Sequence, residues 1–113
     1  MLRFGPYTLD VEKCNVQRED WPKVGLTRFE ATILETLAKQ AGQVVPRDEI
    51  NAALYGSGPP ARVMSPHSNG IEVFVRRIRV KLDPIGEIGL IKTVRGQGYM
   101  LRSWPQENIE QAA

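Results

Sequence analysis

Hydrophobic and polar positions alternate in short runs along the first 25 residues and then change to a helical period. The early runs LRF, YTLDV, CNVQ and WPKVGL are separated by turn formers such as Gly5-Pro6, which predicts three or four short antiparallel strands. Apolar residues then recur at helical spacing, and Thr27 with Glu30 forms a capping box at the start of this helix. Gly42 is expected to end the helix. Its expected buried stripe is Phe29, Ile33, Leu34, Leu37 and Ala41.

Two further helices are expected after this one. A short helix should run from about Pro46 to Tyr55 and bury Ile50, Ala53 and Leu54. The stretch 56–67 is rich in Gly, Pro and Ser and predicts a loop. A longer helix should follow and end at Asp83-Pro84. Its apolar residues have the i, i+3, i+4, i+7, i+11 spacing of one helical face: Ile71, Phe74, Val75, Ile78 and Leu82.

The opposite face of the longer helix is basic. With 3.6 residues per turn, it carries Asn69, Val73, Arg76, Arg77 and Val80, flanked at one edge by Glu72 and Arg79. Arginine can bond bidentately to guanine, asparagine can do so to adenine, and valine can touch a thymine methyl group. Taken alone, this pattern also fits an ordinary core helix whose basic face is simply solvated.

A β-hairpin is expected about eight residues after the longer helix. The β-prone runs 90–95 and 98–102 flank a turn in which Gly96 and Gly98 can take positive φ. Arg95 should project beyond the hairpin, where a guanidinium suits a minor groove or a phosphate. Thr93 and Tyr99 offer hydroxyl groups to phosphate oxygens. A plain surface hairpin is the alternative, but a basic helix followed by this hairpin is a more specific pattern.

Charge and length limit the classes of partner and the number of domains that the chain can have. The 113 residues carry a net charge of +2, yet residues 62–102 alone carry +5, as a surface for a polyanion requires. We expect one domain over residues 1–104 and a disordered polar tail over 105–113. No apolar run approaches the ~20 residues of a membrane span, and no signal peptide is evident.

The residues that could support catalysis or metal binding do not predict an enzyme. Cys14 is the lone cysteine, expected in a strand, and His67 is the lone histidine, expected in a loop. The sequence contains no recognisable nucleophile motif, metal cluster or phosphate loop. We therefore expect no catalytic activity, no metal and no cofactor, in a cytoplasmic setting where thiols stay reduced.

These elements predict an α+β fold, a winged helix-turn-helix with an N-terminal antiparallel four-stranded sheet, three helices and a C-terminal β-hairpin wing. With these elements in this order, the chain resembles the OmpR/PhoB family of response-regulator effector domains. The S-N-x-x-E-V form of the motif at the start of the basic helix looks most like the PmrA/QseB branch. The matching blocks cover nearly the whole chain after Val24: LTRFEATILETLAKQAGQVVPRDEI, LYG, S-N-x-x-E-V-x-V-x-x-x-R-x-K-L and T-V-R-G-Q-G-Y.

The resemblance implies sequence-specific binding of double-stranded DNA in transcription regulation. In the major groove it would place Asn69, Val73, Arg76 and Arg77, with Arg77 the first choice for a base contact. It would put Arg95 in the minor groove. The phosphate-contacting or wing-shaping positions would be Tyr55, Arg79, Thr93, Gly96, Gly98 and Tyr99. The alternative is a winged helix that docks an acidic protein partner.

Partners also follow from the resemblance. Two copies would bind head to tail on a direct-repeat operator, and the loop 56–67 would touch RNA polymerase. A receiver domain and a cognate sensor kinase would lie outside this chain, which we expect to be a fragment of a two-domain regulator rather than free-standing. Three departures matter: Pro46 replaces a usual capping serine, Phe74 replaces a common histidine, and the loop contains Pro59, Pro60 and Pro66.

Overall fold

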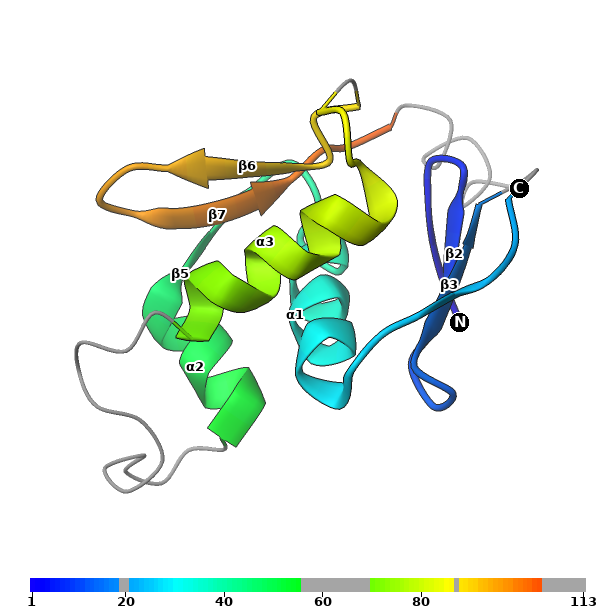
Figure 1. Cartoon of the computed structure of the whole chain (residues 1–113). Helices are drawn as coiled ribbons and strands as arrows, with labels where there is room; N and C mark the ends of the chain where they lie inside the picture. Colours follow the sequence, from blue (N-terminus) through cyan, green and yellow to red (C-terminus); the bar gives the residue numbers. More distant parts are fainter. Residues whose placement is uncertain (19–20, 56–69, 87, 105–113) are drawn as a thin grey trace, which may run out of the picture.

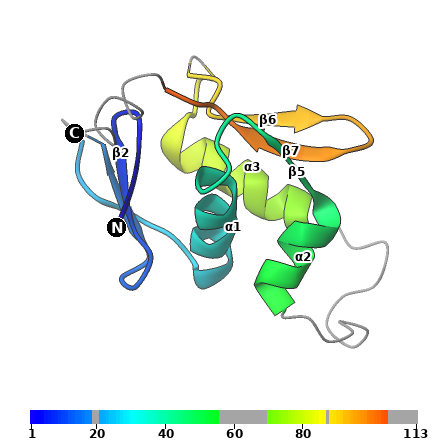
Figure 2. The same ribbon diagram turned by 180° about the vertical axis from the view of Figure 1, so that it is seen from behind.

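Two antiparallel sheets lie on either side of three helices (Figure 1). The computed structural model of the chain describes residues 1–18, 21–55, 70–86 and 88–104. The first sheet has the order β1 (Leu2–Phe4), β2 (Tyr7–Asp10), β3 (Asn15–Arg18) and β4 (Val24–Gly25). The second sheet has the order β5 (Val44–Pro46), β7 (Gly98–Leu101) and β6 (Ile91–Val94). The helices are α1 (Arg28–Ala38), α2 (Arg47–Tyr55) and α3 (Gly70–Leu82), and the view from behind also shows α1 between the two sheets (Figure 2).

The first sheet confirms the strands expected from the early apolar runs. Leu9 of β2 pairs with Leu2 of β1 and with Val16 of β3, so one face of the sheet is apolar. Phe4, Leu9 and Val16 on this face are fully buried. The expectation for Cys14 was wrong: it lies in the turn before β3 with φ +53°, because its backbone N–H bonds back to Val11 O at 3.3 Å.

Helix α1 begins with the predicted capping box. The backbone N–H of Glu30 donates to Thr27 Oγ1 at 3.1 Å, and the N–H of Thr27 donates to Glu30 Oε1 at 3.0 Å. Ile33, Leu34 and Leu37 are fully buried, whereas Phe29 is half-buried. The helix ends at Ala38, so placing Ala41 on its stripe was wrong. A tight turn over residues 40–43 takes its place.

Strand β5 is the element that the sequence did not predict. Pro46 was expected at the start of a helix but is the last residue of β5, where it pairs with Gly98 of β7. A proline is tolerated there because β5 lies at the edge of the sheet. The expected hairpin wing therefore belongs to a three-stranded sheet.

Helices α2 and α3 largely follow the predicted patterns. In α2, Ile50 is fully buried and Leu54 is half-buried, but Ala53 is exposed. The prediction for Ala53 was wrong because the buried side of α2 is shifted towards Asn51, which is half-buried, and Ala53 lies about 160° from Asn51 around the helix. In α3 all the expected apolar positions are buried except Phe74, which is half-buried against the ring of Phe29 on α1, 5.3 Å away.

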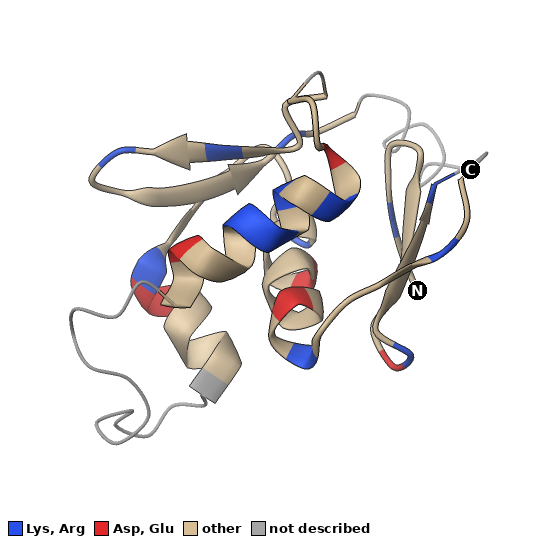
Figure 3. Cartoon of the chain, viewed as in Figure 1, with Lys and Arg blue, Asp and Glu red and all other residues tan. Residues whose placement is uncertain are grey.

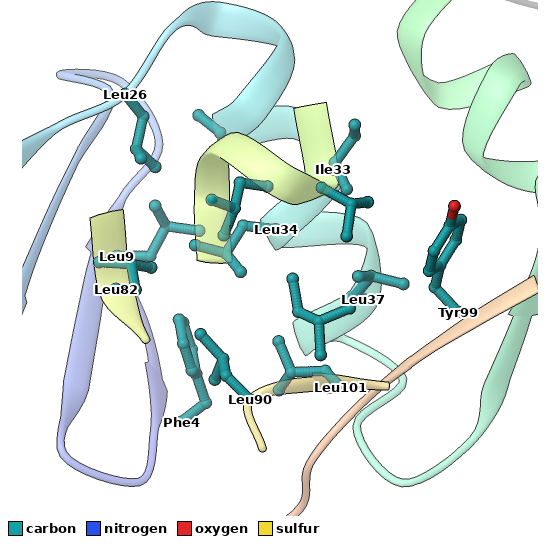
Figure 4. Close-up of a cluster of buried hydrophobic side chains, with 14 of the residues drawn as sticks. Phe4, Leu9, Leu26, Ile33, Leu34, Leu37, Leu82, Leu90, Tyr99 and Leu101 are labelled. Carbon is teal, nitrogen blue, oxygen red and sulfur yellow. The ribbon is translucent and has the colours of Figure 1, made fainter. Parts of the chain in front are cut away.

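One hydrophobic core joins the layers and holds α3 in place (Figure 4). Phe4 and Leu9 from the first sheet, Leu34 from α1 and Leu101 from β7 meet there with Leu82 of α3. The C-terminal end of α3 is also fixed by polar contacts. The Tyr7 hydroxyl donates to the Leu82 carbonyl at 2.9 Å. The carboxylate of Asp83, just after the helix, accepts from the N–H groups of Ile88 and Leu90.

Candidate nucleic-acid interface

The exposed face of α3 carries the expected apolar and basic side chains. Arg76 and Arg77 are exposed, and Val73 and Val80 are 38% and 63% exposed. They lie opposite the side that packs on the core, so the helix presents guanidinium groups and small apolar side chains together. Figure 3 shows the Lys and Arg positions following one another along α3. Such a mixture can contact base edges and thymine methyl groups.

One cation of α3 is turned away from this face. Lys81 Nζ lies 2.7 Å from Oε1 of Glu30, which is fully buried in α1. A buried carboxylate needs a partner of opposite charge, and Lys81 supplies it. Lys81 is therefore part of the α1–α3 packing rather than of the exposed basic face.

Arg79 joins α3 to the wing. Its Nη2 donates to Ile91 O at 2.8 Å and to Thr93 Oγ1 at 2.9 Å, and its Nε donates to Ile91 O at 3.3 Å. The structure thus brings together Arg79 and Thr93, two of the residues that the resemblance assigns to phosphate. Their contact fixes the distance between α3 and β6. Sequence spacing cannot show it, because twelve to fourteen residues separate the bonded groups.

The tip of the wing is basic. Arg95 is exposed in the turn between β6 and β7, which is closed by a bond from the Gln97 N–H to Val94 O at 3.0 Å. Gly96 takes φ +72° in this turn, as expected for a position that favours glycine. A blue segment marks the cation at this end of the hairpin in Figure 3. The exposed Arg95 side chain can extend beyond the strands.

Gly98 and Tyr99 begin β7 directly after the turn, in the strand between β5 and β6. Tyr99 is only 2% exposed, and its ring packs in the core (Figure 4). Gly98 lies so close to β5 that a side chain would meet the carbonyl group of Val45. Both residues therefore shape the wing. Any contact of Tyr99 with phosphate would be confined to its polar atoms.

Arg47 is a basic residue that the sequence analysis did not single out. It is the first residue of α2, its side chain is 48% exposed, and it forms an ion pair with Glu72 of α3. Its guanidinium carbon lies 5.7 Å from the centre of the Tyr99 ring. A cation in the first turn of a helix is disfavoured by the helix dipole, and this anomaly could have drawn attention to it.

Some expected positions lie outside the described residues. They are Asn69, the side chain of Tyr55, the loop 56–67 with His67, and the tail 105–113. Within the described ranges, no group of three or more His, Cys, Asp or Glu residues could hold a metal ion. None of the helices there combines the length and apolar character needed to cross a membrane.

Comparisons with known proteins agree with this geometry. Residues 22–101 match the family model described as "Transcriptional regulatory protein, C terminal". The chain is 38% identical over 99 residues to the two-component response regulator PhoP of Pseudomonas aeruginosa, covering 88% of this chain and 41% of PhoP. It is 36% identical over 104 residues to the response regulator MprA of Mycobacterium tuberculosis, covering 92% and 43%. The chain thus spans less than half the length of these curated relatives.

Solved structures share the fold. The DNA-binding domain of CpxR from E. coli matches with a TM-score of 0.73 and 27% identity, over 90% of this chain and 95% of that one. The DNA-binding domain of Klebsiella pneumoniae RstA, solved in complex with the RstA box, matches with a TM-score of 0.71 and 30% identity, over 89% and 95%. Together with the family match, these likenesses show that the chain belongs to the family of transcriptional regulatory protein C-terminal domains, the OmpR/PhoB-type winged helices.

Proposed function

We propose that this domain binds double-stranded DNA sequence-specifically and regulates transcription as the effector domain of a response regulator. The observation that carries the proposal is the basic face of α3, which is left uncovered by the core and is tied to the wing by Arg79. In this arrangement α3 lies in the major groove and Arg95 reaches the adjacent minor groove. The RstA domain, solved on its own DNA box, supports this proposal.

Each residue that the resemblance singled out has a distinct role in the proposal. Arg76 and Arg77 contact base edges, Val73 contacts a thymine methyl group, and Asn69 contacts an adenine. Arg79 and Thr93 approach a phosphate as a bonded pair, which presents both donors in a fixed geometry. Tyr55 and Gly96 complete the backbone contacts, Gly96 through close approach of the main chain. Gly98 and Tyr99 shape the wing that carries Arg95.

Further partners are part of the same proposal. Two copies bind head to tail on direct repeats whose centres are one helical turn, about 10–11 bp, apart. The loop 56–67 contacts RNA polymerase. A receiver domain, phosphorylated by a sensor kinase, controls the effector domain. The support for these partners is membership of the family and the likeness to PhoP and MprA, which are named response regulators.

Selection from a random duplex library at two salt concentrations tests the proposal. Enrichment of a direct repeat with one-turn spacing is the expected result, with affinity falling steeply as salt rises. Recovery of no motif, with binding lost at moderate salt, would leave only a generic surface for polyanions. An acidic protein partner would then be the better candidate.

Variants of the selected complex separate base readout from phosphate contact. Arg77→Ala should lose ~1–3 kcal/mol at one base pair and relax the preference there, whereas Arg28→Ala, an exposed cation on α1, should not. Uniform weakening on all sequences would contradict the base contact. Arg95→Ala should weaken binding most on sites with narrow A·T minor grooves, and equal loss on G·C-rich flanks would contradict minor-groove insertion.

A further inference from the structure

Helix α3 contains one acidic residue among its cations. Glu72 lies in the first turn of the helix, and Arg76, Arg77, Arg79 and Lys81 follow it. With about 100° per residue, Glu72 falls on the same edge as Arg79, about 20° from it around the helix. Arg79 bonds to β6, so this edge is the one that faces the wing. A carboxylate at this edge borders the surface on which a polyanion would lie.

Glu72 is held by the cation at the start of α2. An ion pair joins Arg47 Nη2 and Glu72 Oε2, and the two side chains are 48% and 41% exposed. Because Arg47 also lies over the ring of Tyr99, its guanidinium is placed where α2, α3 and β7 meet. Figure 3 shows the acidic segment of α3 next to the basic start of α2. The second oxygen of Glu72, Oε1, is buried and accepts no hydrogen bond from the described residues.

Because both side chains of this ion pair are partly exposed, another anion can compete with Glu72 for Arg47. A guanidinium fork fits a carboxylate and a phosphate with the same geometry. Arg47 can therefore bond either to Glu72 or to a DNA phosphate that approaches the edge of α3. A phosphate that takes Arg47 must displace the carboxylate and come close to its negative charge.

We propose that Glu72 limits non-specific DNA binding by competing with phosphate for Arg47. The inference rests on the proposed DNA-binding function. Non-specific binding consists almost entirely of phosphate contacts, so masking one cation weakens it most. Specific binding also has base contacts, which offset the lost phosphate contact. The masked cation is therefore a larger share of the total binding free energy for non-specific DNA than for the operator.

The test measures the affinity of the full chain for a random-sequence duplex over a range of salt concentrations. Glu72→Gln keeps the shape of the side chain and removes its charge, which frees Arg47 for phosphate. Affinity at moderate salt should rise about 3- to 10-fold, and the slope of log K against log salt should steepen by about one. Glu35→Gln removes the same charge from α1, where Glu35 pairs with the exposed Lys39, and should leave the slope unchanged.

Variants without the Arg47 guanidinium form the second part of the test. Arg47→Gln alone should leave the salt slope unchanged, because the paired arginine does not neutralise a phosphate. Its affinity should fall, because the Glu72 carboxylate then repels the duplex without a cation beside it. Adding Glu72→Gln to Arg47→Gln should no longer steepen the slope. Thermal unfolding of each variant checks that the fold is retained.

The outcomes are distinct. A Glu72→Gln slope equal to that of Glu35→Gln would overturn the inference. So would a shallower slope for Arg47→Gln, or a steepening of the slope by Glu72→Gln that persists without Arg47. If the unaltered chain binds no duplex at any salt concentration, the proposed function itself fails, and the inference fails with it.

Discussion

Replacing Gly98 by alanine should push the wing away from β5. Gly98 has φ +156° and lies opposite Pro46 in the sheet. A Cβ atom built there would overlap the carbonyl oxygen of Val45 and lie 2.9 Å from its carbonyl carbon and 3.0 Å from Pro46 Cα. All these neighbours are backbone atoms, which cannot rotate out of the way as a flexible side chain could. The strands must therefore separate.

Two costs add at this position. Overpacking in a closely packed site costs about 1–3 kcal/mol, and a positive φ that residues other than glycine rarely adopt costs about 1–2 kcal/mol more. A loss of about 2–5 kcal/mol in the free energy of unfolding is a large part of the total for a domain of this size. It corresponds to a fall in Tm of roughly 10–25 °C.

Two other glycines provide matched controls for thermal unfolding followed by circular dichroism. Gly96 has φ +72° but no atom within 4 Å of a built Cβ, so Gly96→Ala should cost only about 1–2 kcal/mol. Gly25 has open space and no positive φ, so Gly25→Ala should change stability by less than about 0.5 kcal/mol. If Gly98→Ala lowers Tm no more than Gly96→Ala does, the close approach of β5 and β7 is not what requires glycine.

Two further predictions concern buried polar groups. Lys81→Ala leaves the buried carboxylate of Glu30 without its cation, so urea denaturation should show a loss of about 2–3 kcal/mol, whereas Lys39→Ala at an exposed pair should cost under about 0.5 kcal/mol. Equal losses would show that Glu30 does not depend on Lys81. Tyr7→Phe removes the hydrogen bond to the Leu82 carbonyl and should cost about 1–2 kcal/mol. Burial raises the pKa of Tyr7 above its ordinary value of 10.0, so the folded state holds the phenolic proton more tightly than the unfolded state does. The resulting stability is complete below pH 10.0 and is lost as the pH rises through the folded pKa. Stability of the unaltered chain should therefore fall more steeply above that pH than stability of Tyr7→Phe, and parallel curves would contradict the assignment.

The sequence determined the local elements and their exposed faces. The capping box of Thr27 and Glu30, the end of α3 at Leu82 and the outward position of Arg76 and Arg77 were all predictable. Each depends on residues within about one or two helical turns, so periodicity and end signals are enough. The early strands were predictable for the same reason, since turn formers separate short apolar runs.

Tertiary structure alone decided how these elements meet. Strand β5 exists because residues 44–46 pair with residues 98–100, which are more than 50 positions away, and the isolated run is too short to predict a strand. The Arg79 bonds to the wing and the pairing of Arg47 with Glu72 likewise join separate elements. Such contacts depend on how the core closes and not on local spacing. They set the distance between α3 and the wing, and with it the surface that the chain offers to DNA.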